Sequence, residues 1–234
     1  MRNVRVSMLV TLTPQFRTQS DLGQGTGIVP ILQWQLAPTS LKSQELATEL
    51  SDIDPEISSI FGRLHFIFHR SELTDLSSTD LHDLTCFVIH KLLLLAPLSP
   101  RFSKQSALSE CLRLAMVLYM LIIHGTTYYS HDDLSHAILV QLDRSLANLM
   151  QSDYVQGSLG LWVLSVGMAA SPNESRLQDL ARQASTFAST LNLCTWGDIM
   201  GHLESVLWVK THRADSVRHM WEAILKDGAN AVPK

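Results

Sequence analysis

The sequence predicts an all-α fold, a single irregular helical domain of about eight helices. From Asp54 onward, apolar residues recur at the three- and four-residue intervals of an amphipathic helix. Several of these runs begin at a capping residue and end at proline or glycine. No segment shows the regular apolar and polar alternation of a half-buried strand.

Composition sets the limits of this prediction. The chain has 234 residues, 46% of them hydrophobic and 17% charged, which is enough for one large core. Its 18 basic residues are scattered among 22 acidic residues, and the formal net charge is −4. Because phosphate neutralisation needs clustered Lys and Arg, we expect no direct binding of nucleic acid.

The N-terminal part differs in composition from the rest. Residues 1–52 mix Gly, Gln, Thr, Pro and Ser with short apolar pieces, so we expect a flexible segment. Within it, residues 1–20 are interpreted as an irregular leader rather than a targeting segment. GQGTG, Gly23–Gly27, does not complete the GxGxxG phosphate loop and is interpreted as a turn. The helical domain is expected over residues 53–226, followed by a disordered tail over 227–234.

The first two helices have clear start signals. Asp54 is placed to cap the first, and Pro55 occupies its first helical position. Ser78 or Thr79 is expected to cap the second, which ends at Pro97.

The third helix is expected within SECLRLAMVLYMLIIHG, Ser109–Gly125, and to stop at Gly125. Its uninterrupted apolar run, Leu114–Ile123, is shorter than the ~20 residues that span a bilayer. A helix that is apolar all round is normally enclosed by its own fold, so we predict a core helix and no membrane association. The positions predicted to be buried are Leu114, Val117, Leu118 and Leu121.

The remaining helices follow the same logic. One starts near Asp132 or Asp133, acids that suit the positive end of a helix. LGLWVLSVGMAA is almost wholly apolar and is expected to lie at the centre. Ser171 and Thr195 are placed to cap two further helices, and RADSVRHMWEAIL forms the last, before Asp227 and Gly228.

Two groups of polar residues have spacings that could suit a metal ion. His65 and His69 stand at i and i+4, a spacing compatible with zinc, but Phe66 occupies the position where a zinc metalloprotease has Glu. Without a third ligand, they are interpreted as surface or groove histidines.

The triplet His131, Asp132 and Asp133 is the second cluster. It suggests either a His–Asp metal phosphohydrolase or a DDxxD prenyl-transfer enzyme, although His136 stands at the fifth position. The phosphohydrolase would need further ligands, for which the candidates are His90, His124, Asp143 and Asp153. Helix capping explains the two acids without a metal.

Other reactive residue types give no site. Cys86, Cys111 and Cys194 form no CxxC pair and lie among apolar neighbours, which indicates buried, reduced thiols. GSLG, Gly157–Gly160, is not the GxSxG nucleophile motif. The tryptophans of the C-terminal helices are expected to fill the core. We therefore predict no catalytic, cofactor-binding or metal-ligating residues and no cofactor.

Three segments resemble the C-terminal regulatory region of fungal-specific transcription factors. The first has an acid, an Arg, then small and apolar residues with a Tyr: Glu110, Arg113, Leu114, Ala115, Leu118 and Tyr119. The second is similar to the Trp-containing helix of the family, Gly160–Ala170. The third is similar to its series of Leu, Thr-Trp and Leu-Trp: Leu191, Leu193, Thr195, Trp196, Leu203, Leu207 and Trp208, with Trp221 in the closing helix.

The chain departs from the family in two ways. Arg176 is followed by Leu177, Gln178 and Asp179 rather than by an aromatic pair. The six-cysteine zinc cluster through which the family reads DNA is not present in this chain.

The resemblance implies a nuclear regulator or coregulator of transcription without its own DNA reader, for metabolic or secondary-metabolite genes. It would act through other proteins, self-association or a small-molecule effector. The alternatives are a metal-dependent hydrolase or prenyl-transfer enzyme that uses His131, Asp132 and Asp133, and a helical interaction scaffold.

Overall fold

The computed structural model describes residues 30–39, 44–69, 76–95, 104–125, 132–149, 157–171, 174–209 and 213–230. Every regular element in these ranges is a helix, so the all-α prediction is confirmed. The helices, in chain order, are α2 (Leu32–Leu36), α3 (Gln44–Glu49), α4 (Pro55–His69), α5 (Ser78–Leu94), α6 (Lys104–His124), α7 (Asp132–Leu149), α8 (Ser158–Ala170), α9 (Glu174–Thr190), α10 (Trp196–Val206) and α11 (Ala214–Asn230).

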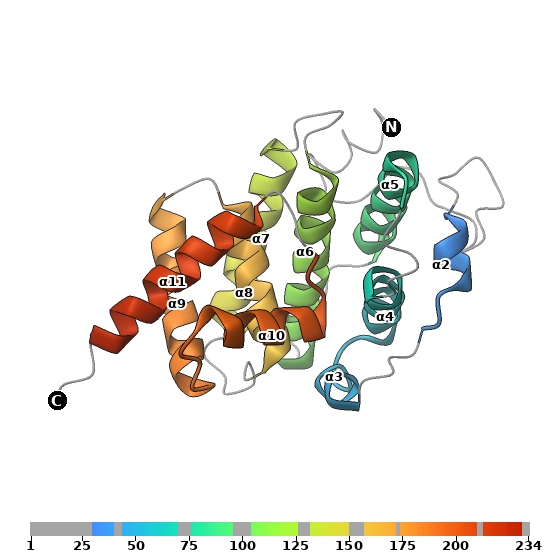
Figure 1. Cartoon of the computed structure of the whole chain (residues 1–234). Helices are drawn as coiled ribbons and strands as arrows, with labels where there is room; N and C mark the ends of the chain where they lie inside the picture. Colours follow the sequence, from blue (N-terminus) through green and yellow to red (C-terminus); the bar gives the residue numbers. More distant parts are fainter. Residues whose placement is uncertain are drawn as a thin grey trace.

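Helix α6 occupies the centre of the molecule. It runs between α4 and α5 on one side and α7 and α8 on the other, and it contacts all four (Figure 1). Its end is set by Gly125, whose φ of 68° lies in the left-handed region that glycine adopts at helix C-termini. The four positions predicted to be buried are buried, Leu118 completely.

The apolar run of α6 is a core element. Within the described ranges, α6 alone is long and apolar enough to cross a bilayer, over an 18-residue window from Ala107 to His124. Inside the fold, 89% of that window is buried. The surrounding helices therefore enclose the face that a lipid-exposed helix would present.

Helix α8 is the second central element. All thirteen of its residues are buried, as its nearly uninterrupted apolar sequence predicts. Gly167 brings the helix close to its neighbours, since a Cβ there would make ordinary contacts with Leu180 of α9 and Leu142 of α7. Helices α9, α10 and α11 cover α8 on the other side (Figure 1).

The cap of α4 is the one the sequence predicts. Asp54 Oδ1 accepts hydrogen bonds from the amides of Glu56 and Ile57, at 2.9 and 3.2 Å. The amide of Asp54 donates to Ser109 Oγ of α6 at 2.8 Å. The cap thus also fastens the start of α4 to the central helix.

The cap of α5 lies one residue before Ser78 and two before Thr79, the two predicted candidates. Ser77, not Ser78 or Thr79, has extended backbone angles, and its Oγ accepts from the amide of Asp80. Ser77, Ser78 and Thr79 are consecutive hydroxyl residues, and by local sequence each of them could cap the helix.

The caps predicted for the later helices have mixed outcomes. Thr195 caps α10 through a capping box with Asp198, as predicted. Ser171 instead follows the last residue of α8, and α9 is described from Glu174 onward. Helix α7 begins at Asp132, so both acids lie in its first turn and its cap lies outside the described residues.

Within the segment expected to be flexible, residues 30–39 and 44–52 contain helices α2 and α3; residues 1–29 and 40–43 lie outside the described residues. Trp34 of α2 is 2% exposed and packs edge-on against Phe87 of α5 at 5.2 Å between ring centroids. Arg63 of α4 lies over the Trp34 ring and donates to its backbone oxygen at 2.6 Å. Helices of five and six residues are too short to show periodicity and are stabilised by such packing.

The segment expected to be a disordered tail, residues 227–234, begins inside a helix. Helix α11 continues through Asp227 and Gly228 to Asn230, and residues 231–234 lie outside the described residues. Glycine weakens a helix interior by about 1 kcal/mol, which does not stop a helix that Val217 and Trp221 anchor to the core.

The contact between α4 and the segment before α3 can be tested with a matched pair of glycines. A Cβ on Gly62 would lie 2.7 Å from the backbone oxygen of Thr39, whereas a Cβ on Gly201 of α10 meets nothing within 4 Å. We expect Gly62→Ala to lower the free energy of unfolding by about 1–3 kcal/mol through overpacking. Gly201→Ala is expected to raise it by about 0.5–1 kcal/mol, since alanine favours the helix. Urea titration followed by tryptophan fluorescence measures both; equal effects of the two changes would contradict the proposed contact.

Candidate functional site

An aromatic cluster joins the three segments that carry the family resemblance. Tyr119 of α6 lies 5.3 Å from Trp162 of α8 and 6.3 Å from Trp208, between ring centroids. The Tyr119 hydroxyl accepts from the amide of Val209 at 2.9 Å, and Trp162 Nε1 donates to the backbone oxygen of Leu207. Burial raises the pKa of Tyr119, so its hydroxyl is neutral. The cluster is a packed junction of α6, α8 and the chain after α10.

A second buried tryptophan is held by a similar polar contact. Trp221 of α11 donates from Nε1 to Ser165 Oγ at 3.0 Å, and Ser165 Oγ donates to the backbone oxygen of Leu161 at 2.9 Å. Trp162 and Trp221 have no exposed surface, as predicted for core tryptophans. Trp196 and Trp208 are partly buried against the same core.

Glu110 and Arg113 form an ion pair inside the core. Arg113 Nε lies 2.9 Å from Glu110 Oε2, and Arg113 Nη1 donates to the backbone oxygen of Leu92 at 2.9 Å. Their side chains are 9% and 3% exposed. The guanidinium thus neutralises a buried acid and also satisfies a carbonyl group near the end of α5.

The His65 and His69 rings stack at 3.9 Å between centroids at the surface of α4. Their nitrogens face carbonyl oxygens at the end of α10: His69 Nε2 lies 2.6 Å from Glu204 O, and His65 Nε2 lies 3.4 Å from Ser205 O. Burial, and then the neighbouring His69, lowers the pKa of His65 to about 4. The pair joins α4 to the C-terminus of α10, where ring N–H groups satisfy free carbonyls.

Of the residues named in the His131, Asp132 and Asp133 hypothesis, those that the structure describes do not come together in one site. Asp132 and Asp133 are exposed in the first turn of α7, and His131 and Asp153 lie outside the described residues. Asp143 pairs with Arg176 of α9 at 2.8 Å. Among the described residues, no group of three or more His, Cys, Asp or Glu is arranged to hold a metal ion.

Ser158 and His202 make a contact that the sequence did not indicate. Ser158 Oγ, at the start of α8, lies 2.7 Å from His202 Nδ1 of α10. The amides of Ser158 and Leu159 donate to the Glu49 carboxylate at 3.3 and 2.9 Å, and a Cβ on Gly157 would lie 2.9 Å from that carboxylate. The amides that would stabilise an oxyanion are therefore occupied, and the contact fastens α3 and α10 to α8.

A titratable cluster of His82, Cys86 and His124 lies between α5 and α6, and we call it the histidine–cysteine cluster. His82 Nδ1 lies 2.8 Å from His124 Nε2, and His82 Nε2 lies 3.7 Å from Cys86 Sγ. His124 Nδ1 lies 3.1 Å from the backbone oxygen of Gly125. His82 and Cys86 are partly exposed, whereas His124 is 8% exposed. This is the candidate site that the geometry favours.

The surroundings of the cluster shift the pKa values of Cys86 and His124 toward their uncharged forms. Burial, and then the nearby charge of Asp83, raises the pKa of Cys86 to about 11, so the thiol stays protonated. Burial is the main cause that lowers the pKa of His124, and the proximity of His82 lowers it further. From the sequence, His124 is a candidate only as a further metal ligand beside His131. The sequence does not pair His124 with His82, because the two residues are 42 positions apart.

His90 is a buried residue of α5. It lies about one helical turn beyond Cys86 and about two turns beyond His82. It is 2% exposed, and among the described residues neither ring nitrogen has a hydrogen-bond partner. Burial lowers its pKa below the value of about 6.5 that an unfolded chain has. The unfolded state therefore binds the proton more readily, and stability is lost as pH falls below that value.

We expect His90→Leu to raise the free energy of unfolding by about 1–3 kcal/mol at pH 7, because it removes an unsatisfied buried polar ring. Its free energy of unfolding should also fall less between pH 7 and pH 5 than that of the wild type. Urea titration at both pH values measures this, with His219→Gln on the exposed face of α11 as the control. A destabilised His90→Leu protein would contradict the assignment.

Comparisons with known proteins do not identify a family, since no family model, curated protein or solved structure matches this chain.

Proposed function

We propose that this chain is a nuclear regulator or coregulator of transcription that acts through protein contacts or an effector rather than by reading DNA itself. The target genes expected from the resemblance are metabolic or secondary-metabolite genes. Its partners would be a transcription factor or a second copy of the chain.

The observation that carries the proposal is the junction of the three similar segments. Tyr119, Trp162 and Trp208 each come from a different one of these segments, and they pack together at the aromatic cluster. Residues of the first segment, Glu110 and Arg113, tie α6 to α5. The three similar segments are spread over about 100 residues, and side chains from all three meet in one core. This supports a shared helical domain more strongly than three isolated apolar helices would.

Charge supports the absence of direct DNA reading. The formal net charge is −4, and the basic side chains Arg113 and Arg176 pair with acids within the fold. Arg63 and Arg213 donate to backbone oxygens of Trp34 and Ala169. These guanidinium groups are engaged internally rather than gathered in a patch that would neutralise phosphates.

The test is to fuse the whole chain to a heterologous DNA-binding domain and to measure transcription from a reporter in a fungal host. The expected result is a change in reporter transcription relative to the DNA-binding domain alone. Gly201→Ala, a surface change, should retain the effect, and Leu118→Asp, a core change, should abolish it.

Two outcomes would overturn the proposal. Unchanged reporter transcription together with recovered protein partners would favour a helical scaffold. Tight, sequence-specific DNA binding by the isolated, metal-free chain in a mobility-shift assay would contradict the absence of DNA reading.

A further inference from the structure

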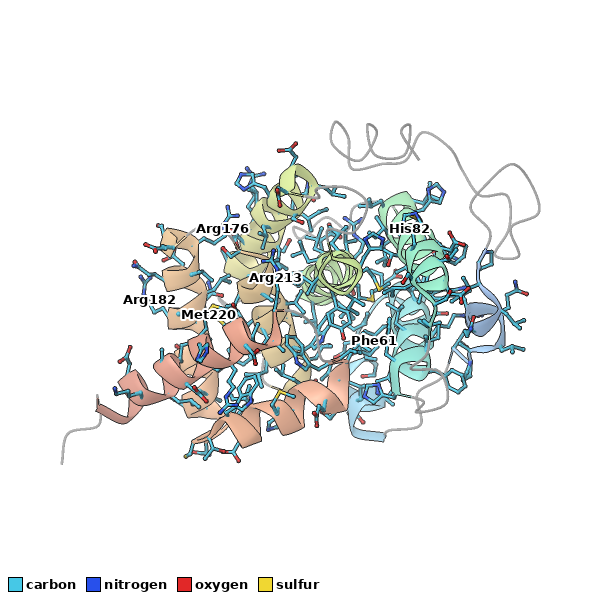
Figure 2. The ribbon with its side chains drawn as sticks, turned by 45° about the horizontal axis from the view of Figure 1, so that its top comes forward. Phe61, His82, Arg176, Arg182, Arg213 and Met220 are labelled. Atoms are coloured by element: carbon cyan, nitrogen blue, oxygen red, sulfur yellow. The ribbon has the colours of Figure 1, made fainter. Side chains whose placement is uncertain are left out.

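The histidine–cysteine cluster brings two imidazoles from different helices into direct contact. His82 lies in the second turn of α5, and His124 is the last residue of α6, so the two helices run in opposite directions at this point. Figure 2 labels His82 on α5, beside α6, which is seen along its axis. The closest nitrogens, His82 Nδ1 and His124 Nε2, are 2.8 Å apart.

The contacts on the far sides of the rings fix which nitrogen carries the proton. His124 Nδ1 faces the carbonyl oxygen of Gly125, so this nitrogen is the donor and Nε2 carries the lone pair. In the metal-free chain, His82 Nδ1 donates its proton to that lone pair. His82 Nε2 then accepts from the Cys86 thiol, which burial keeps protonated.

We propose that His82 and His124 form a two-imidazole site for one borderline-soft divalent ion of the zinc, nickel or copper(II) class. The ion is held by His82 Nδ1 and His124 Nε2, and water completes its coordination. On binding, the ring proton of His82 moves from Nδ1 to Nε2 through solvent, and the new Nε2–H donates a hydrogen bond to the sulfur of the Cys86 thiol, which keeps its own proton. The ring stays neutral, and no net proton is released.

Three features of the cluster suit this ion. Metal-binding histidines usually donate their other ring N–H to a carbonyl or similar acceptor, as His124 Nδ1 does to Gly125. Burial lowers the pKa of His124, which favours the neutral form that binds metals. Two ligands bound at about 2.0–2.1 Å in a tetrahedral site stand about 3.3 Å apart, so the two rings need to separate by about 0.5 Å and to turn until both nitrogens point at the ion.

The ligand set also selects the class of ion. Imidazole nitrogen suits zinc, nickel and copper, whereas magnesium and calcium prefer several oxygen ligands. Binding of Mg²⁺ or Ca²⁺ at this position is therefore not expected.

The chain contains a matched control pair. His65 and His69 are also two close imidazoles, but their nitrogens face the carbonyl oxygens of Glu204, Ser205 and His65 itself. A metal there would have to displace those hydrogen bonds. Both pairs are close imidazoles. In the pair His82 and His124 a nitrogen of one ring faces a nitrogen of the other, whereas in the pair His65 and His69 the nitrogens face carbonyl oxygens.

The test is titration of the full chain with Zn²⁺ and with Ni²⁺, followed by isothermal titration calorimetry or by competition with a chromophoric chelator. The wild-type chain should bind one equivalent of the ion, and its affinity should fall about tenfold or more in His82→Gln and in His124→Gln. His69→Gln should retain it, Cys86→Ser should weaken it less than either of those two histidine changes because serine can still accept the hydrogen bond of His82, and Mg²⁺ should give no binding at this site. Circular dichroism checks that each variant is folded.

A measurement on the wild-type chain avoids any dependence on the folding of the variants. Nitrogen NMR of the imidazoles should show Zn²⁺ shifting the signals of His82 Nδ1 and His124 Nε2, with the signals of His65 and His69 unchanged. Equal affinity in wild type and His82→Gln, or Zn²⁺ shifts confined to other histidines, would overturn the proposal. Loss of binding in Cys86→Ser as severe as in the histidine variants would overturn the two-imidazole assignment, since it would make the thiolate a ligand.

Discussion

Leu118→Asp is expected to unfold the domain. Leu118 lies in the middle of α6 with no exposed surface, and neighbouring helices enclose the central helix on both sides. The change removes a buried apolar side chain and places a carboxylate where the described structure offers no paired cation. Together these effects exceed about 5 kcal/mol, which is comparable with the whole stability of an ordinary domain.

The control for this change is Leu36→Asp. Leu36 of α2 is 71% exposed, so a carboxylate there remains in water and stability should change little. Circular dichroism measures the helix content of both variants, and a thermal melt compares their stability. A soluble, cooperatively melting Leu118→Asp protein would show that α6 is not enclosed as described.

The second large effect is expected from Arg113→Met. The change leaves the Glu110 carboxylate buried without its partner, and the backbone oxygen of Leu92 loses a donor. Breaking a buried ion pair from one side typically costs about 3–5 kcal/mol. Urea titration of the variant should therefore show a much lower transition midpoint than the wild type has.

The double variant Glu110→Leu/Arg113→Met separates the charge from the packing. With both charges replaced by apolar side chains, we expect most of the lost stability to return, since the attraction within a buried pair roughly offsets its desolvation. A double variant as unstable as Arg113→Met would mean that the hydrogen bond to Leu92, rather than the unpaired acid, accounts for the loss.

The sequence predicted the helices from Asp54 onward because each is long enough to show its own pattern. Asp54 and Thr195 cap their helices as expected, since a cap depends on contacts within one turn. The cap predicted for α5, Ser78 or Thr79, was wrong because neighbouring hydroxyl residues are locally equivalent and Ser77 is the cap. Ser171, predicted to cap the next helix, instead follows the last residue of α8.

Helices α2 and α3 could not be predicted because their stability is not local. Five or six residues cannot sustain a helix in water, and Trp34 and Glu49 hold these helices through contacts with α4, α5 and α8. The histidine–cysteine cluster was missed for the same reason. Its two histidines are 42 positions apart, and only the antiparallel packing of α5 and α6 joins them.

The sequence by itself determined that this chain is all-α and that α6 and α8 lie in the core. Periodicity and apolar content are properties of single helices, so they can be read along the chain. Only the tertiary structure decided which polar residues meet. It joined Ser158 to His202 and His82 to His124, and it turned His65 and His69 toward carbonyl oxygens. Side-chain chemistry depends on distances of about 3 Å, and those distances are set by how helices pack against one another.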